Sequence, residues 1–91
     1  MDDDPIPKLK RQLAAELVRV MDGWPQANAA ARMRTHPPRV ADLRHGRLGR
    51  FSVESLVRFL TRLRHQVVFT VVSDHELWRQ AAVARARAKE G

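Results

Sequence analysis

The sequence predicts one mainly α-helical domain with five helical stretches and a single β-strand. Three observations lead to this fold class. Apolar residues recur three or four positions apart over most of the chain, which is the period of one helix face. Proline and glycine interrupt that period at several places. One short run, residues 66–72, is rich in β-branched residues and too short for a helix.

The first two helices are predicted over residues 7–21 and 26–33. Leu9, Leu13 and Leu17 share one face of the first helix, and Pro7 suits a first helical position. Glycine ends this helix and proline starts the next one within residues 22–25, where we expect Trp24 to pack in the core. The second helix is so rich in alanine that another backbone can approach it closely.

The third and fourth helices have recognisable start signals. Paired prolines place the start of the third helix at Pro37 or Pro38, and it runs to Arg44 before Gly46 ends it. Ser52 is predicted to be the N-cap of the fourth helix, residues 53–63, whose apolar side chains point inward.

The predicted strand, residues 66–72, implies a second copy of the chain. A lone strand leaves its backbone N–H and C=O groups unpaired, so we expect an identical strand to pair with it across a homodimer axis. The expected dimerisation residues are Val67, Val68, Phe69, Val71 and Val72.

The chain divides into an acidic tail (1–6), a central domain (7–72) and a C-terminal helix (73–91). Residues 73–76 read Ser-Asp-His-Glu, a capping box that would start this last helix. Leu77 and Trp78 follow it, and they either close the core beneath the strand or form a surface that binds a partner protein.

Positive charge is concentrated in the middle third of the 91 residues. The chain has 17 Lys and Arg against 10 Asp and Glu, a net charge of +7. Residues 32–64 hold nine of the arginines and two acidic residues, which accounts for the whole excess, and no lysine. A basic segment in an otherwise balanced chain indicates a polyanionic partner, and the planar guanidinium suits phosphates and guanine edges.

Several classes of protein are disfavoured. The absence of cysteine excludes disulfides and thiolate chemistry and favours a cytoplasmic location. The longest uncharged apolar run is too short to span a membrane, and the N-terminus does not resemble a signal peptide. We expect no metal and no cofactor, because the histidines are scattered and no phosphate-binding loop is present. Without a catalytic constellation, an enzyme is not expected.

Residues 26–44 have the pattern of a DNA-reading helix-turn-helix. Ala30 supplies the small side chain that the crossing of the two helices requires, and Val40 and Leu43 would anchor the second helix. Gln26 opens the first helix of the pair, where it can reach a DNA phosphate. Arg39 lies near the start of the second helix and is the expected base reader, with His36 and Asp42 as further candidates. Arg44, Arg47 and Arg50 are expected to contact phosphates.

The segment WPQANAAARMRTHPPRVADLRHG resembles the Xre/Cro family of bacterial and phage repressors. The following RLGRFSVESLVRFLTRLRHQVVFTV, with its Phe-Ser start and a strand after the helix, is similar to the compact HigA-type antitoxins. This resemblance implies a homodimeric repressor that binds a double-stranded DNA operator, regulates its own operon and neutralises a RelE/HigB-like toxin.

The turn departs from the family pattern at four consecutive positions, 34–37. The family usually has glycine where Arg34 stands, so Arg34 either has a strained left-handed backbone or belongs to a different turn. Asp42 either accepts a hydrogen bond from cytosine or forms an ion pair with a nearby arginine. Two alternatives to the repressor-antitoxin therefore remain: an interaction module that neutralises a partner without specific DNA binding, and a phage-type repressor without a toxin.

Overall fold

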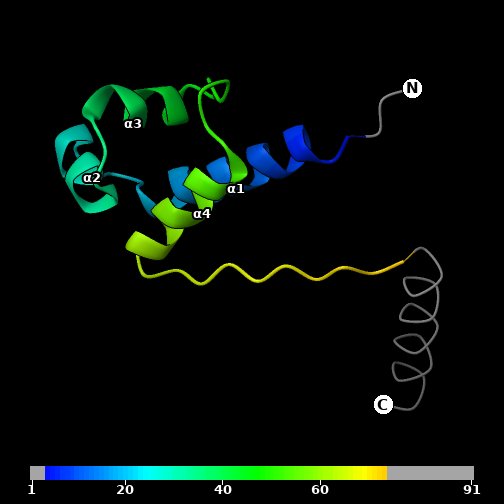
Figure 1. The fold of residues 1–91 in the computed structure, drawn as a ribbon. Helices are drawn as coiled ribbons and strands as arrows, with labels where there is room; N and C mark the ends of the chain where they lie inside the picture. Colours follow the sequence, from blue (N-terminus) through cyan, green and yellow to red (C-terminus); the bar gives the residue numbers. More distant parts are fainter. Residues whose placement is uncertain (1–3, 74–91) are drawn as a thin grey trace, which may run out of the picture.

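The computed structural model describes residues 4–73, most of which lie in four helices. In chain order these are α1 (Ile6–Val20), α2 (Gln26–Met33), α3 (Pro37–Arg44) and α4 (Val53–Arg62). α1 packs along α4, and α2 packs on α3, which also contacts α1 (Figure 1). The described part of the chain is therefore a small all-α helix-turn-helix fold.

One hydrophobic core is shared by all four helices. The predicted inner face of α1 is buried at Leu13 and Leu17, while Leu9 is half-buried at the margin of the core. Burying one such leucine stabilises a fold by roughly 1.5–3 kcal/mol. The core consists of Leu13, Ala14, Leu17, Met21, Ala29, Ala30, Met33, Val40, Leu43, Phe51, Leu56, Phe59, Leu60 and Leu63.

Local signals place most helix ends where the sequence predicts them. α2 has the predicted bounds, and α3 starts at Pro37. α4 begins after Ser52, whose hydroxyl accepts from the Ser55 N–H at 3.1 Å, while the Ser55 hydroxyl accepts from the Ser52 N–H at 3.0 Å. The predicted N-cap at Ser52 is thus confirmed, and α1 starts one residue earlier than predicted.

Three helices end in the same Schellman pattern, with a left-handed residue just after the helix. This residue is Arg34 after α2 (φ 57°), Gly46 after α3 (φ 70°) and Arg64 after α4 (φ 64°). Because only glycine adopts this backbone freely, each arginine costs roughly 1–2 kcal/mol there. The closing N–H to O=C pairs are Thr35–Ala30, Arg34–Ala31, Arg47–Asp42, Gly46–Leu43, His65–Leu60 and Arg64–Thr61.

The predicted strand is wrong, and with it the predicted fold class of five helices and one strand. Residues 66–73 contain no strand and no backbone ladder. They run as an open segment away from α4 (Figure 1). β-branched residues favour extended backbone, but a strand also needs a neighbouring strand, and residues 4–73 offer no second extended segment. Val68, Phe69 and Val71 are consequently exposed by 75%, 54% and 96%.

The fifth helix of the prediction, with Leu77 and Trp78, lies outside the described residues. Trp24, which was expected in the core, is half-buried and packs against it. Among the described residues, no helix has the length and apolar character needed to cross a membrane.

Candidate nucleic-acid interface

The helix-turn-helix is formed by α2 and α3 around small and branched side chains. Ala30 is only 2% exposed, as expected for the crossing of the two helices. Val40 and Leu43 are also buried, so they hold one face of α3 against the core. In the turn between the helices, Arg34 has a left-handed backbone. Of the two alternatives for this residue, a strained backbone or a different turn, the structure therefore has the strained backbone.

The start of α3 is set by proline rather than by a side-chain cap. His36 has an extended backbone, and its side chain makes no capping hydrogen bond. Pro37 and Pro38 have no N–H groups, so two of the donors that a helix start leaves unpaired are absent. The Arg39 N–H is bonded to the His36 carbonyl at 2.9 Å. His36 is therefore exposed beside the first turn of α3, which is the part of a recognition helix that approaches base edges.

The outer face of α3 lies opposite Val40 and Leu43. At 100° per residue, this face carries Pro38, Asp42 and His45. The Nδ1 atom of His45 lies 2.7 Å from the Ala41 carbonyl oxygen, which leaves Nε2 as the ring atom available to a ligand.

Arg39 lies on the flank of α3 that faces α4. Its Cζ atom is 4.4 Å from the centroid of the Phe51 ring and 5.7 Å from that of Phe59, and the two rings meet edge to face at 6.2 Å. One Nη2–H donates to the Arg50 carbonyl oxygen at a long 3.4 Å. A guanidinium has five N–H donors, so most of its edge stays available while its face is stacked.

Asp42 is paired with Arg47. The Arg47 Nε lies 3.1 Å from Asp42 Oδ1, and the Arg47 N–H also donates to the Asp42 carbonyl. The structure thus contains an ion pair, one of the two roles considered for Asp42. Because both side chains are partly exposed, the pair contributes about 1 kcal/mol at most.

Arg44 is bonded to backbone carbonyls of its own chain. Its Nη2 donates to the Trp24 carbonyl at 2.6 Å and to the Met21 carbonyl at 3.3 Å. Arg62 similarly donates from Nη1 to the Met33 carbonyl, the last residue of α2, at 2.8 Å. These arginines tie α3 and α4 to the ends of α1 and α2, which gives them a structural function.

The N-terminus of α2 is open to an anion. Pro25 precedes the helix, and no side chain caps it. Gln26 is the first helical residue and is exposed, in the turn whose first N–H groups have no partner within the helix. The expected phosphate contact at Gln26 therefore has a suitable local structure.

Four arginines of residues 32–64 have no hydrogen bond, ion pair or ring contact from their side chains within the described chain. They are Arg34, Arg50, Arg58 and Arg64. Arg50 was among the expected phosphate contacts. Arg34 is a further candidate that the sequence does not single out, because its position in place of the usual glycine indicates only a backbone effect, whereas the structure exposes its side chain in the turn itself.

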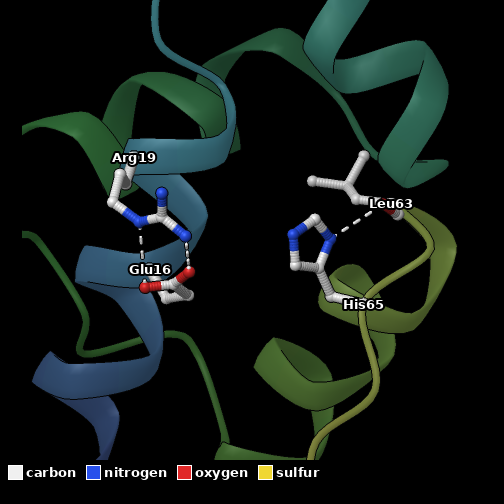
Figure 2. A network of polar contacts seen from close by, with 4 residues as sticks. All are labelled: Glu16, Arg19, Leu63 and His65. Carbon is white, nitrogen blue, oxygen red and sulfur yellow. Dashed lines mark hydrogen bonds and ion pairs between the residues drawn. The ribbon is translucent and has the colours of Figure 1, made fainter.

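A separate polar group lies on α1 and just after α4 (Figure 2). The Arg19 Nε donates to Glu16 Oε2 at 3.2 Å, and this bond and the charge of Arg19 hold the pKa of Glu16 below its usual value. His65 lies nearby, with its Nδ1 2.9 Å from the Leu63 carbonyl oxygen. Within residues 4–73, no group of three or more His, Asp or Glu side chains could hold a metal ion.

A buried crossing at Ala30, an anchored second helix and an excess of arginine around it define a helix-turn-helix domain of DNA-binding regulators. The chain matches the helix-turn-helix domain family over residues 2–72 and belongs to that family. A solved structure described as an XRE-family transcriptional regulator is 35% identical, with a TM-score of 0.74, over 80% of this chain and 84% of that one. No curated protein matches the chain. The Xre-type resemblance is thereby confirmed, and the antitoxin resemblance stays a prediction.

Proposed function

We propose that this chain is a sequence-specific transcriptional repressor that inserts α3 into the major groove of double-stranded DNA. The observation that carries the proposal is the position of Arg39 at the first turn of α3, stacked on Phe51. A guanidinium held by stacking loses little side-chain entropy when it binds, and its free N–H edge can form a bidentate pair with guanine. His36 and Asp42 are further base-reading candidates.

Phosphate contacts would hold the domain on the duplex. Gln26 and the open first turn of α2 are well suited to one phosphate. Arg50 and Arg34 have guanidinium groups without a partner in the described chain. Arg47 and Arg44 would reach phosphates only in addition to, or in exchange for, their present bonds.

A homodimer would place two copies of α3 on one face of the duplex. The exposed side chains of residues 67–72 support this proposal, because a second copy would remove Val68, Phe69 and Val71 from water. The operator would then be a pseudo-palindrome with half-sites about one helical turn, roughly 34–36 Å, apart.

The antitoxin role is the finer part of the proposal. The sequence similarity of residues 47–71 to HigA-type antitoxins, of which the Phe-Ser start of α4 is kept and the strand is not, supports it, and so do the exposed apolar residues after α4, which could contact a RelE/HigB-like toxin. This role is tested by co-expressing the chain with the product of an adjoining toxin-like reading frame. We expect the chain to inhibit that product.

DNA reading is tested by a gel shift with the region upstream of the gene at about 150 mM salt. We expect Arg39→Ala to lower specific affinity roughly 5- to 150-fold, since one bidentate contact contributes roughly 1–3 kcal/mol. Arg11→Ala is the matched control, because Arg11 is an exposed arginine on α1 outside the basic segment. Equal affinities of the two variants for the operator would refute the repressor, and continued inhibition of a toxin would then favour the interaction module.

A further inference from the structure

A pocket of about 300 Å³ lies beside α2 and the end of α4. Its lining consists of Trp24, Arg32, Arg62, Leu63 and Arg64. No residue of α3 and no carboxylate of the described chain lines this pocket. The pocket therefore brings together three positively charged side chains and no negatively charged one. It is separate from the outer face of α3.

Each arginine of the pocket is placed by a different feature. Arg32 lies over the indole ring of Trp24, with its Cζ atom 4.7 Å from the ring centroid. Arg62 uses one N–H on the Met33 carbonyl. Arg64 is the left-handed residue that closes α4, and its side chain has no partner in the described chain. Most of the fifteen N–H donors of these three side chains are consequently unused.

The chemistry of the lining favours one compact anionic group with several acceptor oxygens. Guanidinium groups match the oxygens of a phosphate in planar, charge-assisted hydrogen bonds. An acidic peptide would also need apolar contacts for its flanking residues, but Leu63 is buried and one face of Trp24 is covered by Arg32. We propose that this pocket binds a phosphate group, carried either by a small metabolite or by a nucleic-acid backbone.

Trp24 provides the signal for a direct test. The chain has two tryptophans, so Trp78→Phe leaves Trp24 as the only one. In this background we would titrate inorganic phosphate at constant ionic strength and record tryptophan fluorescence. We expect a saturable change, because a phosphate that engages Arg32 alters the stacking on the indole ring.

Two variants separate the pocket from general charge effects. Arg64→Gly removes a pocket charge while relieving the left-handed backbone, so the variant should fold, and we expect it to raise the phosphate midpoint about tenfold or more. Arg58→Ala removes a charge from an exposed position of α4 that does not line the pocket, and its midpoint should be unchanged. The proposal is overturned if phosphate gives no saturable change, if sodium chloride gives the same change, if the two variants behave alike, or if only an acidic peptide produces the signal.

Binding to a duplex of arbitrary sequence distinguishes the two sources of phosphate. If a backbone phosphate occupies the pocket, Arg64→Gly should reduce the slope of log affinity against log salt by about one unit. If the ligand is a small phosphate ester, the slope should equal that of the parent protein. Either slope is consistent with a phosphate site in the pocket, and the difference between the slopes identifies which phosphate binds there.

Discussion

Replacing Arg34 by glycine should stabilise the domain, although it removes a side chain from the DNA-reading motif. Arg34 closes α2 with φ 57° and ψ 49°, a left-handed backbone that costs a residue with a Cβ atom roughly 1–2 kcal/mol. Glycine removes that cost but makes the unfolded chain more flexible, which offsets about 0.4–1 kcal/mol. The net gain should be about 0.5–1 kcal/mol, which corresponds to a rise in Tm of roughly 2–8 °C for a domain of this size.

The measurement is thermal and urea unfolding, followed by circular dichroism, with two matched variants. Arg34→Ala removes the same charge and keeps the left-handed strain, so its stability should stay within about 0.5 kcal/mol of the parent. Gly46→Ala introduces the strain at the end of α3, where φ is 70° and a Cβ atom would meet nothing within 4 Å. This variant should lose about 1 kcal/mol.

The reasoning is refuted if Arg34→Gly is no more stable than Arg34→Ala, because backbone strain would then not limit stability at this turn. A second readout comes from DNA. Since Arg34 is exposed in the turn without a partner in the described chain, Arg34→Gly should bind duplex DNA more weakly at low salt while unfolding at a higher temperature.

Three further predictions concern single side chains. Ser52→Ala should lower the free energy of unfolding by about 1 kcal/mol in urea titrations, because it removes the N-cap of α4, and an unchanged midpoint would contradict that role. Phe69→Asp should leave the midpoint of thermal unfolding of the monomer nearly unchanged but abolish a dimer in light scattering, whereas a dimer that persists would exclude Phe69 from the interface. Glu16→Gln should reduce stability more at pH 7 than at a pH below the usual carboxyl range, because a lowered pKa stabilises the fold above that range and this contribution is lost as the pH falls through the folded-state pKa. A gap between parent and Glu16→Gln that is the same at both pH values would show that the Arg19 pair does not contribute.

Helix positions were predictable because their signals act over a few residues. The start of α3 depends on Pro37, and that of α4 depends on Ser52 and the N–H of Ser55. The apolar face of α1 follows from a spacing of three and four residues. The strand predicted at residues 66–72 is absent, because a strand also needs a neighbouring strand, which the β propensity of a single segment does not supply.

The roles of the arginines were decided by the tertiary structure. Sequence alone determined where the positive charge lies, that α2 and α3 form a helix-turn-helix, and that Val40 and Leu43 anchor it. Arg44 and Arg62 bond to carbonyls 20 to 29 residues away, and Arg39 stacks on a ring from the next loop. Tertiary packing thus decides which guanidinium groups are bonded to carbonyls, which are stacked on a ring with their N–H edge open, and which have no partner in the described chain, because these groups are brought together by the helices rather than by neighbours in the chain.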